Sequence, residues 1–375
     1  MTVLALEPWY GGSHRRFLDA LVANSSHDVR TVTMADRFWK WRMQGGAVTL
    51  ASKAAEVYDA GLRPDSLLAT DMVNLPAFLA LTRPRFDRTP VALFFHENQL
   101  TYPLREGESR DYTYAYINYL SALVADRLVF NSRYHHDEFF GALPDLLRRF
   151  PDYTHLDSIG KLRTKADVIH LGLDLEGLDR NRPDPGPREP GPPIILWNHR
   201  WEYDKRPDAF FRVVNRLDDA GVRFRLILAG QTFEEQPAEF RAGFHRYAER
   251  VLHYGFAEDF DEYARLLHRA DIVVSTSSHE FFGVSMLEAI HCGCHPLLPD
   301  RLTYPELIPA ELHRPLLHAP VLYRDDDELF EVLRGLLIGR EKPLPVNVLR
   351  GITEPLAWPN QGLRFDDLFE GMAGA

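Results

Sequence analysis

Short runs of consecutive apolar residues alternate along this chain with segments in which apolar residues recur every three or four positions. The runs Val91–Phe95 and Ile194–Trp197 contain no polar side chain, which is typical of strands buried on both faces. The segment Asp111–Ala125 instead carries three tyrosines at helical spacing. This alternation predicts parallel sheets covered by helices on both faces, which is an α/β architecture.

The same pattern predicts the other elements. Before residue 181 we expect strands at 2–6, 91–95 and 128–130, with helices at 12–22 and 111–125. After residue 193 we expect strands at 194–197, 225–228, 272–275 and 295–298, with helices at 208–217, 260–270 and 284–290.

A proline- and glycine-rich segment, Asn181–Pro193, interrupts the alternation near the middle of the chain. It can continue neither a helix nor a central strand. We therefore expect a Rossmann-like domain at 1–180, a linker at 181–193, a second Rossmann-like domain at 194–354, and a C-terminal segment at 355–375 that packs back toward the first domain. Two doubly wound domains would then face a central cleft, with ligands bound at the carboxyl ends of the strands.

Composition fits two folded domains, and the charge differs between the two halves of the chain. The 375 residues are 45% hydrophobic and 26% charged, which supports two folded cores. The net charge of −11 is uneven: residues 1–180 hold 21 Lys and Arg against 23 Asp and Glu, and residues 181–375 hold 22 against 31. The first half is thus at −2 and the second at −9, so a polyanionic partner is expected to meet the first half.

The cysteines and the apolar runs bear on the compartment. Cys292 and Cys294 are separated by one residue, so the chain is not a disulfide scaffold and suits a reducing compartment. No apolar stretch approaches the roughly 20 residues of a membrane helix, and the start shows no signal-peptide pattern. We expect a cytoplasmic protein without membrane insertion. His291 and His295 flank the cysteines, but this spacing does not fit a usual zinc site, so no metal is expected.

Two glutamates mark the stretch Ala270–Pro299. Glu280 lies on the loop after a predicted strand, and Glu288 lies about one turn into the helix that follows. The N-terminus of that helix offers unpaired backbone N–H groups, which suit a diphosphate. Carboxylates beside an anion are useful as acceptors of hydrogen bonds from sugar hydroxyls. The alternative is a surface helix with two incidental acids.

Two cations follow the first strand after the linker. Arg200 and Lys205 lie on the loop 197–207 (WNHRWEYDKRP), where both can reach a phosphate. The alternative is a pair of solvated loop cations.

The first half carries two loops with candidate chemistry. Gly11 and Gly12 permit close approach of a ligand to the backbone, but the pattern is not GxGxxG and so does not indicate a nicotinamide cofactor. His96 follows the run 91–95. Because position 100 is leucine, the HENQL string is not the HExxH of zinc proteases. His96 is either a ligand contact or a satisfied structural histidine.

The segment Arg37–Arg42 (RFWKWR) interleaves cations with large aromatic residues. Such a run can hold phosphates and stack bases or sugars. The alternative is an amphipathic surface segment whose aromatic side chains are buried.

The stretch ADIVVSTSSHEFFGVSMLEAIHCGCHPLLP resembles the Glu-x7-Glu signature of the retaining glycosyltransferases of family 4, which have the GT-B fold. The resemblance implies a nucleotide-sugar donor and no metal, and it names no side chain as an obligate base. It implies that Glu280 holds the sugar hydroxyls, Glu288 the ribose, and His96 the transferred sugar. The residues it assigns to the donor are Gly11, Gly12, Arg200, Lys205, Glu280, Phe282, Gly283, Val284 and Glu288.

A closer resemblance covers most of the chain. In order, EPWYGGSH, FWKWR, FFHENQLTYP, VADRLVFNS, WNHRWEYDKRP, HEFFGVSMLEAIHCGC and LTYPELIPAE are similar to the family of tRNA-queuosine mannosyltransferases. It implies transfer of mannose from GDP-mannose to the cyclopentene-diol of queuosine in a tRNA anticodon. Domain 1–180 would be the acceptor side and domain 194–354 the nucleotide-sugar side. The expected acceptor contacts are His14, Lys40, Arg42, Asn98 and Asn131, with Arg15, Arg16, Arg105 and Arg110 as further cations for RNA phosphates.

Two other functions stay open at this point. One is a GT-B hexosyltransferase that acts on a lipid, a glycan or another small acceptor. A basic, apolar helix in the first domain would favour a lipid, and Leu143–Phe150 is the one weak candidate. The other is a non-catalytic nucleotide- or RNA-binding module, which would neither transfer nor hydrolyse a donor.

Overall fold

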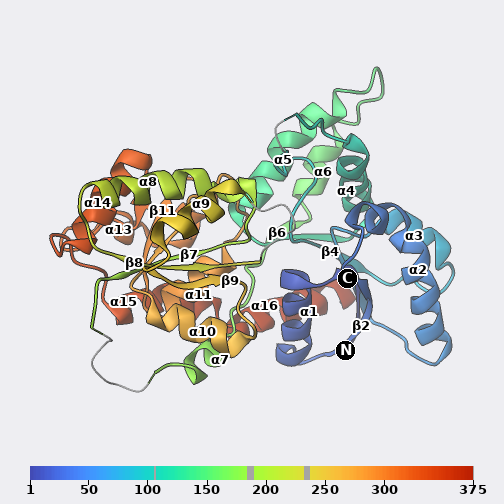
Figure 1. The fold of residues 1–375 in the computed structure, drawn as a ribbon. Helices are drawn as coiled ribbons and strands as arrows, with labels where there is room; N and C mark the ends of the chain where they lie inside the picture. Colours follow the sequence, from blue (N-terminus) through green and yellow to red (C-terminus); the bar gives the residue numbers. More distant parts are fainter. Residues whose placement is uncertain (105–106, 184–189, 232–236, 375) are drawn as a thin grey trace. The chain divides into compact units, whose positions relative to one another are not determined.

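The chain folds into two compact units (Figure 1). The computed structural model describes residues 1–104, 107–183, 190–231 and 237–374. One unit consists of Met1–Gly172 with Trp358–Ala375, and the other of Leu173–Ala357. Each unit contains a six-stranded sheet in which all the pairings are parallel. The predicted α/β class with two doubly wound domains is therefore confirmed.

The first unit follows the predicted alternation and adds elements to it. Its strands are β1 (Thr2–Tyr10), β2 (Asp28–Ala35), β3 (Ser66–Thr70), β4 (Val91–Phe95), β5 (Arg127–Phe130) and β6 (Ala166–Val168). Its helices are α1 (Gly12–Asn24), α2 (Trp39–Asp59), α3 (Leu75–Leu81), α4 (Tyr112–Val124), α5 (Arg133–Leu147), α6 (Ser158–Arg163) and α16 (Trp358–Ala373). The strand order is β2-β1-β3-β4-β5-β6.

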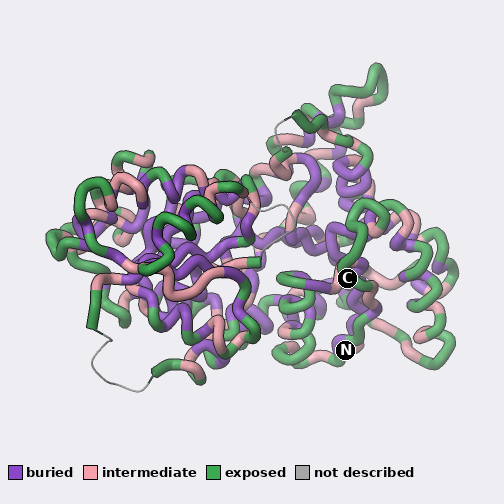
Figure 2. The backbone as a smooth tube through the Cα atoms, in the orientation of Figure 1, coloured by how far each residue is buried: buried purple, intermediate pink, exposed green. Residues whose placement is uncertain are grey.

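The strand order determines which face each helix covers. The chain reverses direction across the sheet after β2, so right-handed crossovers place α1 on one face and α2 and its successors on the other. Accordingly α1 contacts α16, whereas α2 contacts α3 and α3 contacts α4. Figure 2 shows the strands running through the buried interior. β3 and β4 are buried at every position, which explains why the fully apolar run at 91–95 forms a strand.

The second unit has the same architecture. Its strands are β7 (Ile194–Asn198), β8 (Arg225–Ala229), β9 (Val251–Gly255), β10 (Ile272–Val274), β11 (His295–Pro299) and β12 (Leu322–Tyr323). Its helices are α7 (Leu175–Arg180), α8 (Pro207–Asp219), α9 (Ala238–Tyr247), α10 (Phe260–Arg269), α11 (Val284–His291), α12 (Tyr304–Leu307), α13 (Ala310–His313), α14 (Asp326–Leu337) and α15 (Val346–Thr353). Two 3₁₀ turns, η1 (Tyr203–Lys205) and η2 (Glu354–Leu356), complete it. The strand order is β12-β11-β10-β7-β8-β9.

Helices again cover both faces of this sheet. α8 contacts α9 and α14 on one face, and α11 contacts α10 and α15 on the other. The loop after β7 is anchored to the first of these faces, because the Trp201 ring stacks on Phe240 of α9 with centroids 4.0 Å apart. This anchoring matters because the same loop carries the predicted phosphate contacts.

The boundary between the units lies between Gly172 and Leu173, whereas the sequence placed it at 181–193. The difference arises because α7 packs in the second unit. There Asp179 forms an ion pair with Arg350, and the carbonyl oxygen of Leu178 faces Nε2 of His268 at 3.0 Å. The proline-rich segment therefore connects two elements of one unit, and its residues 184–189 lie outside the described part of the chain.

The C-terminal helix α16 belongs to the first unit, which it enters at Trp358 rather than at the expected residue 355. Its Asp366 accepts hydrogen bonds from the Ser25 hydroxyl at 2.5 Å and from the Ser26 amide at 2.8 Å. The ring of Trp358 lies so close to Gly172 that any side chain there would collide with it.

The segment Leu143–Phe150, the weak candidate for a membrane-facing helix, uses its leucine side chains in the core of the first unit. The apolar residues Leu143, Leu146 and Leu147 of α5 are buried in the first unit. Across the described ranges, we find no helix that is both long and apolar enough to cross a membrane.

Candidate active site

The predicted donor residues of the second unit gather at the carboxyl edge of its sheet. Arg200 and Lys205 follow β7, and Glu280 follows β10. These strands are neighbours, and the winding of the sheet reverses between them, because β8 lies on the other side of β7. In open parallel sheets, ligands bind at such a reversal point.

Lys205 and Glu280 form the centre of this site. The distance from Lys205 Nζ to Glu280 Oε2 is 3.3 Å, and the same ammonium group lies 3.1 Å from Asp204 Oδ2. It also donates to the carbonyl oxygen of His279 at 2.7 Å. Burial alone would lower the pKa of Lys205, but the charges of Glu280 and Asp204 outweigh burial and raise it. The lysine therefore stays charged in a buried position, as a phosphate contact requires.

Glu280 is held as a carboxylate by the same pairing. Burial would raise its pKa, but the charge of Lys205 in particular lowers it to about 2. Its Oε1 accepts hydrogen bonds from the amides of Gly283 at 3.1 Å and Phe282 at 3.4 Å. Gly283 has φ = 85° and precedes Val284, the first residue of α11. The Glu280 side chain thus fixes the turn that presents the N-terminus of α11.

Glu288 belongs to a different part of the edge. It is 5% exposed, and its Oε2 accepts a hydrogen bond from the Tyr263 hydroxyl at 2.6 Å. Asn198, the last residue of β7, donates from Nδ2 to the same hydroxyl at 2.9 Å. The sequence-based prediction included neither Tyr263 nor Asn198. Only the position of Asn198 at the end of a fully apolar strand could have indicated it.

Arg200 lies on the same loop but is much more accessible. Its side chain is 48% exposed and lies 3.4 Å from Glu202 Oε2. It is close enough for its charge to disfavour protonation of the buried His199. Arg200 can therefore turn toward an incoming anion without leaving a buried charge behind.

His199 is a candidate that the sequence-based prediction missed. It is 4% exposed, and neither ring nitrogen has a hydrogen-bond partner among the described residues. Burial, assisted by the charge of Lys205, lowers its pKa to about 3, so the ring is neutral. Unsatisfied buried polar atoms beside a charged pair are typical of ligand sites. His199 lies within the WNHRWEYDKRP string, so that motif was the available signal.

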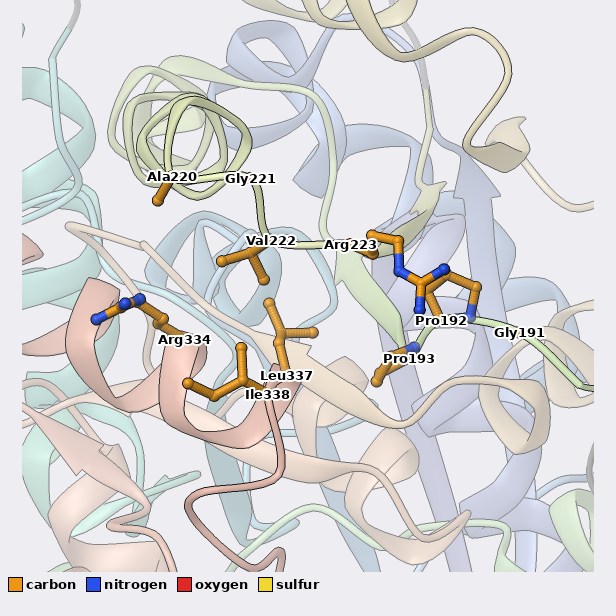
Figure 3. Close-up of a pocket in the computed structure, with 10 residues that line it drawn as sticks. All are labelled: Gly191, Pro192, Pro193, Ala220, Gly221, Val222, Arg223, Arg334, Leu337 and Ile338. Atoms are coloured by element: carbon orange, nitrogen blue, oxygen red, sulfur yellow. The ribbon is translucent and has the colours of Figure 1, made fainter.

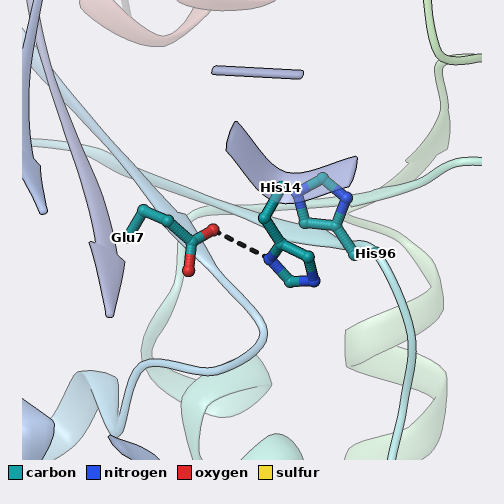
Figure 4. Close-up of side chains that lie close together, drawn as sticks. All are labelled: Glu7, His14 and His96. Carbon is teal, nitrogen blue, oxygen red and sulfur yellow. Dashed lines mark hydrogen bonds and ion pairs between the residues drawn. The ribbon is translucent and has the colours of Figure 1, made fainter. Parts of the chain in front are cut away.

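In the first unit, His14 and His96 lie together at the carboxyl edge of the sheet (Figure 4). His14 Nδ1 is 3.0 Å from Glu7 Oε2, and the His14 ring packs on the His96 ring with centroids 4.0 Å apart. Glu7 is 1% exposed and also accepts from the amide of Trp9 at 2.7 Å. Its burial in a strand of apolar residues gave no signal of this role.

The two imidazoles of this cluster differ in charge. Burial would lower the pKa of His14, but Glu7, and then Asp71 and Glu97, raise it to about 9. Burial and the charge of His14 keep the pKa of His96 well below its ordinary value. His96 is thus neutral, and its Nε2 has no partner in the described part of the chain. A charged donor and a neutral acceptor lie side by side.

The group Glu7, His14 and His96 also has the composition of a metal site, with ligand atoms within 4.8 Å of one another. His14 Nδ1 lies 3.0 Å from Glu7 Oε2, so a metal would either bind His14 through Nε2 or displace that hydrogen bond. In the HCGCH string, the Cys294 thiol donates to the Leu267 carbonyl oxygen, and His291 Nδ1 lies 2.9 Å from the Thr353 hydroxyl. These side chains have separate structural partners.

The paired glycines of the first unit differ in their roles. A side chain on Gly11 would collide with the carboxylate of Asp36, so Gly11 permits the β1–α1 loop to pack against the loop after β2. Gly12 has φ = 52°, and nothing lies within 4 Å of a Cβ built there. The space above Gly12 is therefore open to a ligand, as the prediction requires.

Asn98 and Asn131 hold backbone rather than present open polar atoms. The Asn98 side chain accepts from the amides of Leu100 and Thr101, at 3.0 Å each. Asn131 donates to the His96 carbonyl oxygen at 3.0 Å. They are 0% and 2% exposed. Both side chains position the His96 loop in this structure, and their contact with an acceptor stays a prediction.

The Arg37–Arg42 segment has both exposed and packed aromatic side chains. Phe38 and Trp41 are 76% and 61% exposed, whereas Trp39 packs on Tyr114 with ring centroids 5.1 Å apart. Lys40 Nζ lies 5.6 Å from the centre of the Trp39 ring, and Arg42 Nε donates to the Ala35 carbonyl oxygen at 3.0 Å. Phe38 has φ = 55°, an unusual conformation for a bulky residue.

The other cations named for RNA phosphates behave differently from one another. Arg15 is 63% exposed and lies 3.3 Å from Asp19, and Arg16 is exposed on the same helix. The Arg110 guanidinium donates to the carbonyl oxygens of Gln99 and Tyr102, so it holds the loop after β4. Arg105 lies outside the described residues.

Two cavities open on the second unit. One, of about 670 Å³, is lined by Pro192 and Pro193, which precede β7, and by Gly221 and Arg223, which precede β8 (Figure 3). It therefore lies at the amino edge of the sheet, away from the ligand-binding edge. The other, of about 620 Å³, includes Arg206 and Ser278 and lies at the carboxyl edge.

The fold and these residues define a glycosyltransferase of the GT-B class. The chain superposes on sucrose-phosphate synthase of Thermosynechococcus elongatus with a TM-score of 0.70, at 15% identity and with complete coverage of both chains. Residues 180–320 match the family described as glycosyl transferases group 1.

More specific matches define the family. Residues 2–173 match the N-terminal domain family of tRNA-queuosine alpha-mannosyltransferase. The chain is 32% identical over 316 residues to the tRNA-queuosine alpha-mannosyltransferase of Drosophila melanogaster, which covers 82% of each chain. This chain belongs to the tRNA-queuosine alpha-mannosyltransferase family. It is also 24% identical over 339 residues, 83% of this chain and 82% of the relative, to a GDP-mannose-dependent phosphatidylinositol dimannoside mannosyltransferase of Mycobacterium tuberculosis.

Proposed function

We propose that this enzyme transfers mannose from GDP-mannose to the cyclopentene-diol of queuosine in a tRNA anticodon, with retention at the anomeric carbon. The observation that carries the donor half is the ion pair between the buried Lys205 and the partly exposed Glu280 at the reversal point of the second sheet. The acceptor half rests on family membership and on the cationic, aromatic segment Arg37–Arg42. A tRNA acceptor also accords with a cytoplasmic location.

In the donor half, each residue has a role that its chemistry permits. Lys205 and Arg200 are proposed to contact the diphosphate, which the N-terminus of α11 also faces as an electropositive end. Glu280 would accept hydrogen bonds from mannose hydroxyls, and Glu288, with Tyr263, from the ribose. The GDP-mannose donor is supported by the name of the mycobacterial relative, which is GDP-mannose-dependent.

In the transfer step, the bond between the anomeric carbon and the diphosphate oxygen breaks, and a bond to an acceptor oxygen forms on the same face of the sugar. The acceptor proton passes to an oxygen of the leaving diphosphate, and GDP is released. Cationic groups aimed at the diphosphate stabilise the charge that develops on it as the sugar leaves. With this arrangement we propose no metal and no protein side chain as obligate base.

In the acceptor half, the first unit is proposed to bind the anticodon arm. Lys40 and Arg42 would contact phosphates, and the exposed rings of Phe38 and Trp41 are suited to unstacked bases. Asp36, which directly precedes this segment, packs against Gly11 so closely that only glycine fits at position 11. His14 and His96 are proposed to contact the acceptor and the transferred sugar, respectively.

The test is transfer by the purified protein from labelled GDP-mannose to tRNA that contains queuosine. The control acceptor is the same tRNA without queuosine, and UDP-glucose is the control donor. We expect label only with GDP-mannose and queuosine-containing tRNA. Transfer to a lipid or glycan but not to tRNA would overturn the acceptor assignment alone. Absence of both transfer and donor hydrolysis would favour a non-catalytic binding module.

A further inference from the structure

Five arginines converge on the cavity of about 620 Å³ at the carboxyl edge of the second unit. We call it the arginine cavity; its arginines are Arg206, Arg212, Arg216, Arg301 and Arg324. They come from separate elements, namely the loops after β7, β11 and β12 and the helix α8. Arginines gathered from four places in the chain require an explanation in a half that carries a net charge of −9.

The guanidinium groups are held in position but remain accessible. Arg206 binds Asp208 through two contacts, at 2.8 and 2.9 Å. Arg212 lies 2.9 Å from Asp326, and its side chain is 50% exposed. Ion pairs this exposed contribute little free energy, so an incoming phosphate can displace a carboxylate at small cost. Each guanidinium also has five N–H donors, so several can bind a phosphate and keep part of the existing contacts.

Arg301 and Arg324 are both exposed members of the cavity. Arg301 donates from Nη2 to the carbonyl oxygen of Ser277 at 3.1 Å, which leaves most of its donors for a ligand. Arg324 is 70% exposed and shares Glu328 with Arg314. The three aspartates of the lining, 325–327, belong to the start of α14, and Asp325 already accepts from the Glu328 amide. The lining itself holds five arginines and three aspartates, and Asp208 and Glu328 pair with Arg206 and Arg324 from beside it, so a phosphate would exchange for carboxylate contacts.

The backbone at the cavity is strained and locked. Arg206 and Leu302 have φ values of 53° and 63°, a region that residues other than glycine rarely adopt. The hydroxyl of Thr276 donates to the carbonyl oxygens of Lys205 and Arg206, at 2.8 and 3.0 Å. Strain that the surroundings maintain in this way occurs mainly at functional sites. The same lock fixes Lys205 on the other side of the loop.

We propose that the arginine cavity binds backbone phosphates of the RNA acceptor, next to the donor residues of the same unit. Planar guanidinium groups match phosphate oxygens in pairs, and arginine is the usual residue for such contacts. This proposal rests on the proposed function, because it takes the acceptor to be a tRNA. It differs from the expectation, drawn from the uneven charge of the two halves, that a polyanionic partner meets the first half of the chain.

The test compares the variant Arg301→Ala, Arg324→Ala with a matched control, Arg223→Ala, Arg340→Ala. The control removes two exposed arginines of the same unit that lie outside the cavity. The dissociation constant is measured against salt for tRNA with and without queuosine. A phosphate contact contributes about 0.7–0.9 to the slope of log K against log salt. We expect the cavity variant to lose about tenfold in affinity at low salt and about one to two in slope, equally for both tRNAs.

The control variant should bind tRNA like wild type. The melting temperature and the affinity for GDP of both variants should also stay close to the wild-type values. Unchanged tRNA affinity in the cavity variant would overturn the proposal. Binding of inorganic phosphate at the cavity that leaves the tRNA affinity unchanged would also overturn the proposal, since the cavity would then hold a free anion. Arginine-dependent binding without sugar transfer would support the cavity but contradict the proposed function, so the two failures are distinguishable.

Discussion

At the scale of single residues, Lys205 combines a structural role with the phosphate contact proposed for it. It is 6% exposed and neutralises both Asp204 and Glu280. Removing one partner of a buried ion pair leaves an uncompensated charge, which typically costs about 3–5 kcal/mol of folding free energy. A solvated loop lysine could be replaced by alanine with little loss of stability, whereas the burial of Lys205 predicts a clear loss for Lys205→Ala.

Lys205→Ala should therefore lower activity by about 10²-fold or more, about 3 kcal/mol in the transition state, and also lower the melting temperature. Arg200→Ala should lower activity without a comparable loss of stability, because Arg200 is 48% exposed. Steady-state transfer rates and thermal melts of both variants check this, with the exposed Lys342→Ala as control. A normal turnover in both variants would remove the phosphate assignment.

The Glu7–His14 pair predicts a pH dependence of stability. The pKa of His14, about 9, lies above its ordinary value of 6.5, so the pair stabilises the fold fully below pH 6.5. That contribution is lost as the pH rises through 9. Melting temperatures of wild type should fall over this interval, and Glu7→Gln should flatten the fall. Glu370→Gln, at an exposed partner of His27, should not change the profile. Parallel profiles for wild type and Glu7→Gln would refute the coupling.

At the scale of elements, the fully apolar strands could be predicted almost to the residue. Val91–Phe95 is β4 as expected, and Ile194–Trp197 is β7 without its final Asn198. β2 was missed because it is an edge strand with exposed and buried residues mixed, so it lacks a continuous apolar run. The boundary before α7 was missed because α7 is held by contacts across a large sequence separation, such as Asp179 with Arg350 and Leu178 with His268.

Within the site, motifs identified the residues but not their contacts. Glu280 and Lys205 could be named from spacing on two loops, and their pairing follows from the adjacency of β7 and β10. Glu7 and Tyr263 could not be named, because a carboxylate inside a strand and a tyrosine on a helix have no local signature. Their roles arise only when distant elements meet.

The turn into α11 predicts a strict requirement for glycine at position 283. Its φ of 85° suits glycine, and a Cβ there would lie 3.1 Å from the ring of Tyr304. Gly283→Ala should cost about 1–2 kcal/mol of stability and lower activity, since it displaces the helix N-terminus that is proposed to face the donor. Chemical denaturation and transfer assays check this. Gly351→Ala in α15, where nothing lies within 4 Å, should be tolerated; equal effects at both positions would contradict the explanation.

Variants at the start of α2 should impair acceptor binding without impairing donor chemistry. Lys40→Glu with Arg42→Glu should reduce tRNA modification strongly and leave slow donor hydrolysis intact. Because Arg42 also donates a hydrogen bond to the Ala35 carbonyl oxygen, Phe38→Ala, which removes only an apolar side chain, serves as a second variant. Assays of tRNA binding and donor hydrolysis on wild type and on both variants check this. If donor hydrolysis and tRNA modification are both lost, the segment is needed for folding instead.

At the scale of the whole molecule, the proposed chemistry relies on protein cations rather than on a metal. Transfer should survive excess EDTA, because Lys205, Arg200 and the N-terminus of α11 are proposed to neutralise the diphosphate. Activity assays before and after chelation check this. Complete loss that Mg²⁺ or Mn²⁺ restores would contradict the mechanism and direct attention to Glu7, His14 and His96.

Charge over the whole molecule also shapes acceptor binding. A net charge of −11 opposes association with RNA, so binding must depend on local groups such as the Arg37–Arg42 segment and the arginine cavity. Such binding should weaken steeply as salt rises.

The most direct test of the central claim is mass spectrometry of the nucleosides of tRNA from cells with and without this protein. The account predicts a queuosine nucleoside heavier by one hexose in the presence of the protein, with unmodified queuosine accumulating in its absence. Restoration by wild type but not by Arg200→Ala would tie the product to the donor site. Identical nucleoside profiles in the two cell lines, in tRNA that contains queuosine, would contradict the claim.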